Sequence, residues 1–162
     1  MKVVDVMMGT PYHCRPETNL GAATELMWTG NCGFLPVVGN DGNVIGIVTD
    51  RDICVALGTR GQPSGEVKVA EVMSSKVYSC KPEDDIHVAL RAMRDGHVRR
   101  LPVITREGAL VGVISMDDVL LRAEAPGPGG KPELSSEEIV KTFRSINVRQ
   151  LPQAVATKRA VA

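Results

Sequence analysis

Two short stretches of the sequence place a glycine, a hydroxyl and a carboxylate at matching spacing. They are residues 46–52, GIVTDRD, and residues 112–118, GVISMDD. The hydroxyl lies where a strand is predicted to become a helix, beside free N–H groups that favour an anion. The carboxylate three residues later can accept two hydrogen bonds from a sugar diol, and the glycine admits close approach of a ligand or another backbone. Together these groups suit a ribose phosphate, and the residues concerned are Thr49, Asp52, Ser115 and Asp118.

The two stretches belong to a tandem duplication. At an offset of 66 residues, residues 2–57 align with 68–123 without a gap and share 17 identical positions. The sequence of each copy predicts a strand that ends near Cys14 or Cys80, followed by a helix that ends at Gly30 or Gly96. Two strands follow, at 34–38 and 44–49 in the first copy and at 100–104 and 110–115 in the second, with turns at Asp41-Gly42 and Glu107-Gly108 between them. A short helix beginning near Asp50 or Met116 closes the β-α-β-β-α unit.

A copy of this size is marginal as an independent domain, so the two copies are expected to pack about a pseudo-twofold axis into one α+β body. We divide the chain into a first repeat at 1–60, a second at 67–124, a Gly/Pro-rich linker at 125–134 and a C-terminal helix and tail at 135–162. The residues from 58 to 66 suit a surface connection.

The C-terminal helix is predicted by a capping box formed by Ser135 and Glu138. Its apolar residues share one face that needs an apolar partner, so the helix folds back on the repeats or swaps across a dimer. The face consists of Ile139, Val140, Phe143 and Ile146.

Composition narrows the function classes. Nineteen basic residues balance nineteen acidic ones and aromatic residues are few, so neither DNA nor RNA is an expected partner. No apolar run approaches the length of a membrane span and no signal peptide is apparent, which favours a cytoplasmic protein. The four cysteines include no C-x-x-C pair, so no metal site or disulfide framework is predicted. No nucleophile has an evident base, so the chain is not expected to be an enzyme.

The paired motifs, with the Val-Met, Leu-Pro-Val and GIVTDRDI stretches, resemble the tandem cystathionine beta-synthase (CBS) domain pair over residues 1–123. The resemblance implies a non-catalytic module that binds AMP, ADP, ATP or S-adenosylmethionine between its copies, forms a homodimer and signals occupancy to a regulated partner whose identity stays unknown. It also implies roles for site residues. Asp52 and Asp118 would hold ribose hydroxyls, Thr49 and Ser115 would contact ribose or phosphate, and Ile47 and Val113 would line the adenine slot.

The family often places basic residues before the Leu-Pro-Val strand. The second copy matches with His97, Arg99 and Arg100, whereas the first has Asn31, Gly33 and Phe34 in their place. The resemblance therefore implies a single phosphate-competent cleft, with Arg100 as the main charge partner and Arg51 as a weaker one.

Three simpler interpretations stay open. Each hydroxyl and aspartate could be an ordinary helix N-cap, and Arg99-Arg100 could be a solvated strand edge. The chain could also be a structural or interaction protein that acts through its C-terminal helix with no ligand bound. Residues 134–162 carry five basic and two acidic side chains, which would suit an acidic partner.

Overall fold

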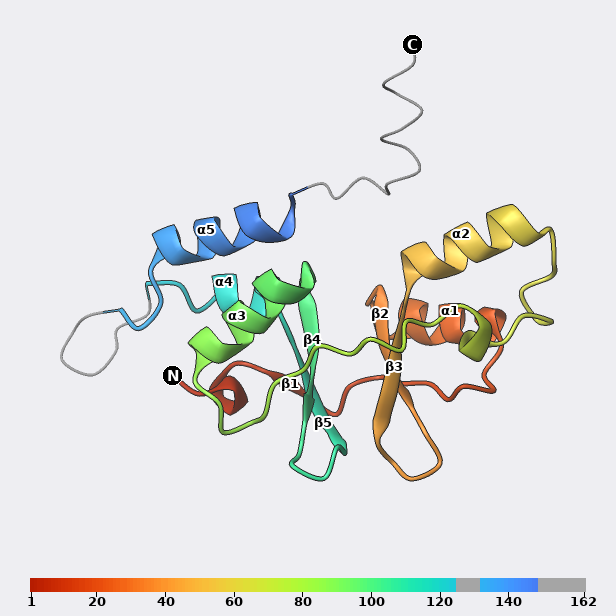
Figure 1. The fold of residues 1–162 in the computed structure, drawn as a ribbon, viewed down its shortest axis with the longest axis horizontal. Helices are drawn as coiled ribbons and strands as arrows, with labels where there is room; N and C mark the ends of the chain where they lie inside the picture. The colour runs from red at the N-terminus through yellow and green to blue at the C-terminus, as the bar shows by residue number, and fades with distance from the viewer. Residues whose placement is uncertain (125–131, 149–162) are drawn as a thin grey trace, which may run out of the picture.

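The computed structural model describes residues 1–124 and 132–148, and it forms two lobes side by side with helices above short antiparallel strands (Figure 1). The predicted α+β architecture is confirmed. The first lobe contains α1 (Leu20–Thr29), β2 (Phe34–Val38), β3 (Val44–Thr49) and α2 (Asp50–Arg60). The second contains α3 (Ile86–Gly96), β4 (Arg100–Ile104), β5 (Leu110–Ser115) and α4 (Met116–Leu120).

The two hairpins have the same register. Pro36 pairs with Ile47 in one, and Pro102 pairs with Val113 in the other. The predicted strands ending near Cys14 and Cys80 are wrong in extent, because each is a single parallel bridge to the neighbouring hairpin. Pro16 and Pro82 follow each cysteine two residues later, and a proline has no N–H with which to extend the ladder.

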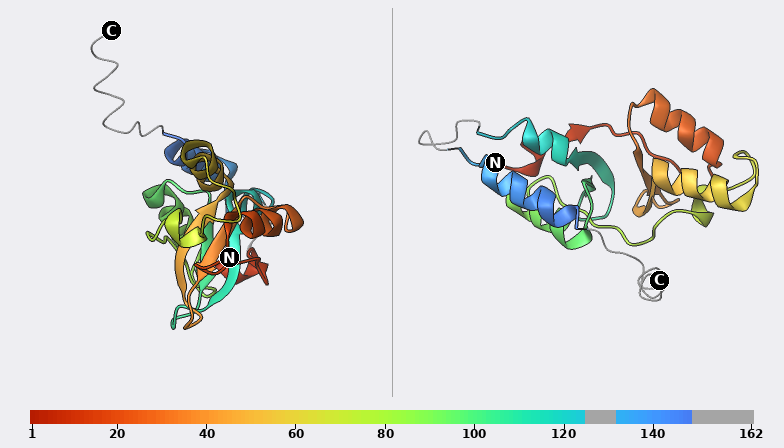
Figure 2. Two further views of the ribbon diagram at one scale, coloured as in Figure 1. Left: turned by 90° about the vertical axis from the view of Figure 1, so that its right-hand side faces the viewer. Right: turned by 90° about the horizontal axis from the view of Figure 1, so that it is seen from above.

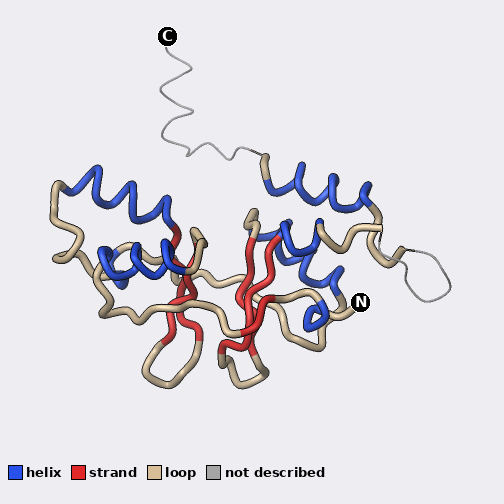
Figure 3. Tube along the Cα trace, turned by 180° about the vertical axis from the view of Figure 1, so that it is seen from behind, coloured by secondary structure: helices blue, strands red, loops and turns tan. Residues whose placement is uncertain are grey.

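The segment that begins each copy packs on the other copy. β1 (Met8–Gly9) pairs with β5 of the second lobe, and Ser74 bridges to Ile47 of the first. Val3 lies in the second lobe's core, whereas Val69 lies in the first lobe's core. Figure 3 shows the strands gathered at the middle of the molecule, with long connections crossing between the lobes. This exchange binds the lobes into one body and was not predicted, since an internal alignment does not tell which copy a segment will contact.

The glycines that open the two chemical motifs serve this exchange. A Cβ added to Gly112 would lie 2.9 Å from the Met8 carbonyl oxygen, and one added to Gly46 would lie 3.0 Å from the Ser74 carbonyl oxygen. The sequence left open whether these glycines allow the close approach of a ligand or of another backbone. In the structure, the group that approaches closely is another backbone.

Two predicted element ends are also corrected. α2 continues through residues 58–60 and ends at Gly61, whose φ of 64° caps the helix, so the surface connection begins later than predicted. α3 includes Gly96 and is capped by His97, whose φ is 50°.

The helix α5 (Ser136–Ile146) folds back on α3 and α4 of the second lobe (Figures 1 and 2). Ile139 and Ile146 are buried there, but Val140 is 50% exposed and Thr142 is buried instead, which corrects the predicted face. The linker residues 125–131 and the tail residues 149–162 lie outside the described part of the chain.

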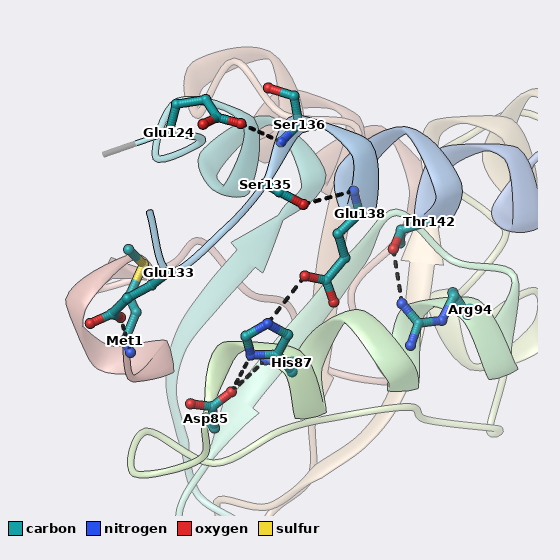
Figure 4. Close-up of polar contacts among 10 residues, drawn as sticks. All are labelled: Met1, Asp85, His87, Arg94, Glu124, Glu133, Ser135, Ser136, Glu138 and Thr142. Atoms are coloured by element: carbon teal, nitrogen blue, oxygen red, sulfur yellow. Dashed lines mark hydrogen bonds and ion pairs between the residues drawn. The ribbon is translucent and has the colours of Figure 1, made fainter. Parts of the chain in front are cut away.

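The start of α5 is held by polar contacts that also correct the predicted capping box (Figure 4). The Ser135 Oγ accepts a hydrogen bond from the Glu138 N–H at 3.2 Å, as predicted. The Glu138 carboxylate instead lies 3.1 Å from His87 Nε2, and His87 Nδ1 lies 2.6 Å from Asp85. Farther along, Arg94 donates to the Thr142 hydroxyl at 2.9 Å.

Within residues 1–124 and 132–148, no helix has both the length and the apolar character to cross a membrane.

Candidate functional site

Both chemical motifs form complete capping boxes at a strand-to-helix junction. In the first, Asp52 Oδ2 accepts hydrogen bonds from the Thr49 N–H at 3.0 Å and the Thr49 hydroxyl at 2.7 Å. In the second, Asp118 Oδ2 accepts from the Ser115 N–H at 2.8 Å and the Ser115 hydroxyl at 2.6 Å. Each hydroxyl oxygen also accepts the N–H of its aspartate. The N-cap interpretation is therefore confirmed in both copies.

Capping does not use up either carboxylate. The bonds from the cap all reach one oxygen, Oδ2, and across the described residues no side chain or backbone group donates to the Oδ1 of Asp52 or Asp118. A carboxylate oxygen has two acceptor sites. Each aspartate can therefore fix its helix and still accept hydrogen bonds from a ligand hydroxyl.

The first cleft, of about 360 Å³, lies beside Thr49 and Asp52. Ile47 forms part of its apolar wall, and Ser74 and Tyr78 enter from the exchanged segment of the second copy. The second lobe contributes the residues that follow α3. The lysine, arginine, histidine and aspartate side chains lining this cleft are Asp50, Arg51, Asp52, Lys76, His97, Arg99 and Arg100.

The second cleft, of about 490 Å³, lies beside Ser115 and Asp118. Val113 lines it in the place that Ile47 takes in the first cleft, and Tyr12 enters from the exchanged segment of the first copy. Its charged lining residues are Arg100, Asp117 and Asp118.

The clefts therefore differ in charge although they share one backbone plan. Four Lys/Arg side chains and two aspartates line the first, and one arginine and two aspartates line the second. Arg100 lines both, and its guanidinium lies 4.0 Å from the Asp117 carboxylate. Asp117 stands where the first copy has Arg51, and Thr10 stands where the second copy has Lys76. An anion is favoured in the first cleft.

All ten predicted ligand-binding residues line a cleft. The pairing was the part that the sequence left open: His97 and Arg99 of the second copy face Thr49 and Asp52 of the first. Lys76 and the two tyrosines were missed as lining residues. Tyr12 and Tyr78 are identical in the internal alignment, and that identity was the available signal. The Lys76 ammonium lies 5.0 Å from the centre of the Tyr78 ring.

A third hollow, the α1–α2 groove of about 510 Å³, lies on the outside of the first lobe. Its walls include Met27, Ile53 and Leu57, and Trp28 on its rim is 85% exposed. Asp50 is the one charged residue that lines it among the described residues. The corresponding face of the second lobe is covered by α5.

Two in-register lobes with a cleft beside each capped aspartate define a tandem-repeat ligand-binding module. The chain belongs to the CBS domain family, whose model matches residues 3–59 and 69–124. Across the described residues, no group of three His, Cys, Asp or Glu side chains is placed to hold a metal ion.

Curated relatives include both small proteins and enzymes. The CBS domain-containing protein YhcV of Bacillus subtilis is 32% identical over 117 residues, 72% of this chain and 81% of YhcV. The protein MK0525 of Methanopyrus kandleri is 30% identical over 116 residues, 72% of this chain and 57% of that protein. Inosine-5'-monophosphate dehydrogenase of Methanocaldococcus jannaschii is 32% identical over 111 residues, but this chain spans only 21% of its length.

Solved structures show the same fold. The CBS domain pair of protein MJ0100, in complex with 5'-methylthioadenosine and S-adenosyl-L-methionine, aligns with a TM-score of 0.67 at 23% identity, over 75% of this chain and 94% of that one. The CBS domain protein TA0289 of Thermoplasma acidophilum aligns with a TM-score of 0.73 at 20% identity, over 93% of this chain and 78% of that one.

Proposed function

We propose that this chain is a non-catalytic regulatory module that binds an adenine nucleotide, AMP, ADP or ATP, in the first cleft. The observation that carries the proposal is the group of cations around the capped Asp52: Arg51, Lys76, Arg99 and Arg100. In the proposed complex, Asp52 Oδ1 accepts the ribose hydroxyls, Ile47 contacts the adenine, and Arg51, His97 and Arg99 face the phosphates. The adenosyl compounds bound by the MJ0100 pair support a ligand of this class.

The second cleft has the same apolar wall and capped aspartate, but its one Lys/Arg lining residue among those described is Arg100, which lies 4.0 Å from the Asp117 carboxylate. It therefore suits an adenosyl compound without phosphates, and the sulfonium of S-adenosylmethionine would be attracted by Asp117 and Asp118. Ligand binding can be signalled to a regulated partner only if the ligand binds one arrangement of the lobes more tightly than another.

The test is calorimetric titration with ATP, AMP and S-adenosylmethionine, first on the unchanged chain and then on Asp52→Asn and Asp118→Asn. The two substitutions alter equivalent capping boxes, so each is the control for the other's cost in stability. Loss of a charged acceptor should weaken ATP at least about tenfold in Asp52→Asn and leave it nearly unchanged in Asp118→Asn. No heat with any of the three ligands, or equal losses in the two variants, would contradict the proposal.

We also propose a homodimer in which the α1–α2 groove of one copy packs against that of a second. The groove is apolar, carries an exposed tryptophan and has a single charged lining residue among those described, so like surfaces meet without strong repulsion. A partner held by the apolar face of α5, the second candidate function, is less favoured because Ile139 and Ile146 are already buried against the second lobe.

A further inference from the structure

One residue belongs both to the first cleft and to the contact between α3 and α5. His97 lines the first cleft, and its Nδ1 lies 3.1 Å from the backbone carbonyl oxygen of Ser145, in the last turn of α5. A carbonyl can only accept, so this bond requires a hydrogen on Nδ1. The nitrogen left for a ligand in the cleft is therefore Nε2.

The Ser145 carbonyl is available because of its place in the helix. The last four carbonyls of an α-helix have no N–H partner within it, and Ser145 precedes the final residue of α5. One turn earlier, Thr142 accepts a hydrogen bond from Arg94 of α3 at 2.9 Å. The end of α3 is thus fixed to α5 at two successive turns, with Ile146 buried beside them.

We propose that α5 is a working part of the first binding site: it orients the His97 imidazole through the Ser145 carbonyl, so that a bound nucleotide and the packed helix stabilise each other. An anion at Nε2 favours the imidazolium, whose Nδ1–H is a stronger donor to the carbonyl. The charged side chains that line the cleft with this ring are Asp50, Arg51, Asp52, Lys76, Arg99 and Arg100, and Arg94 and Arg144 lie in the last turns of α3 and α5. Coupling of this kind is reciprocal.

This inference rests on the proposed nucleotide site, and the probe is ATP. Hydrogen–deuterium exchange on the full chain should show the amides at the end of α5 exchanging about five- to tenfold more slowly when ATP is bound. Helix α1 borders neither His97 nor α5. It serves as the internal control, and the exchange rates of its amides should not change.

Two substitutions of His97 test the roles of its two ring nitrogens. His97→Asn keeps an amide nitrogen near the Nδ1 position and suits the positive φ, since the equivalent Asn31 has a φ of 45°; His97→Gln instead extends its amide toward the Nε2 position. Both should bind ATP more weakly, because His97 faces the phosphates in the proposed complex, so each variant is compared at ATP concentrations that saturate it. At saturation, ATP should slow α5 exchange less than twofold in either. Bound ATP with unchanged α5 exchange in the natural chain, or full slowing in both variants, would overturn the inference.

The nitrogen spectrum of the imidazoles tests the link without ligand. We expect His97 to carry its proton on Nδ1 in the natural chain and in Val140→Ala, and to lose that preference in Ile146→Ala, which loosens the last turn of α5. A proton on Nε2 in the natural chain overturns the inference whether or not ATP binds. Failure of ATP to bind, with the Nδ1 proton in place, overturns the proposed function and leaves α5 as the element that orients His97.

Discussion

The two lobes descend from one repeat, and they differ most where they face something outside themselves. Cores and hairpin registers match: Val48 and Ile114 are fully buried at equivalent positions, as are Leu35 and Leu101. The cleft positions diverge. Arg51 of the first copy corresponds to Asp117 of the second. A duplicated fold can keep its packing and still present two chemically different sites, because packing depends on inward side chains and ligand choice on the few that line a cleft.

The outer helix faces differ in the same way. The α3–α4 face offers His87, Arg94 and His97 to Glu138, Thr142 and Ser145 of α5. The equivalent positions on the α1–α2 face are Gly21, Trp28 and Asn31. A helix with the polar groups of α5 would leave its glutamate unpaired on the first lobe. These contacts favour α5 on the second lobe, and the α1–α2 groove stays open within one chain.

The largest effect on this comparison is expected from the exposed tryptophan of the groove. Trp28→Glu should weaken the proposed dimer about thirtyfold or more, because buried tryptophans at interfaces commonly contribute at least about 2 kcal/mol. Folding should be unchanged, since Trp28 is 85% exposed within one chain. Sedimentation velocity over a concentration series measures the dissociation constant, and Val140→Glu on α5 is the matched control. A dimer equally strong in both variants would rule out this interface.

The next largest effect is expected at a feature that the two lobes share, the glycine that contacts the exchanged segment. Gly46→Ala and Gly112→Ala should each destabilise the fold by about 1–3 kcal/mol, since the new Cβ meets the backbone of the exchanged segment. Gly58→Ala, in the interior of α2 with nothing within 4 Å of the added Cβ, should stabilise it by about 0.5–1 kcal/mol. Urea denaturation gives the three values. Equal stability of all three variants would show that the exchange of segments is not as described.

The smallest effect concerns the cysteines. Burial raises the pKa of the Cys14 thiol to about 11, and burial with the nearby Asp84 raises that of Cys80 to about 12. Both should stay largely unmodified by iodoacetamide between pH 7 and pH 9, because at most about 1% of either thiol is reactive thiolate at pH 9 and both side chains are buried. The exposed Cys54, in the α1–α2 groove, should react at protein concentrations low enough for the proposed dimer to dissociate. Mass spectrometry of the peptides reads the result, and labelling of Cys14 but not Cys80 would mean that the two cores are less alike than described.

The local structure was largely readable from the sequence. The capping motifs, the Asp-Gly and Glu-Gly turns and the duplicated apolar spacing predicted both hairpins, the main helices and the four residues of the two capping boxes, because each of these signals acts within a few residues of its own position. The other six predicted cleft residues came from the family resemblance. The extent of α2 was mispredicted because Gly58 lies inside the helix, which is capped three residues later by Gly61. The cap of α3 and the exposed side of α5 were mispredicted because they depend on the packing of these two helices on each other.

What the sequence by itself determined is the duplicated unit and the presence of two capped aspartates, since hydrogen bonds between residues three apart need no distant partner. Only the tertiary structure decided which residues share a cleft. The exchanged segments bring Lys76 and Tyr78 to the first copy's aspartate, and the packing of the lobes brings His97 and Arg99 there as well. These contacts join residues far apart in the chain, and their free energy comes from burying both lobes together, which no local pattern records.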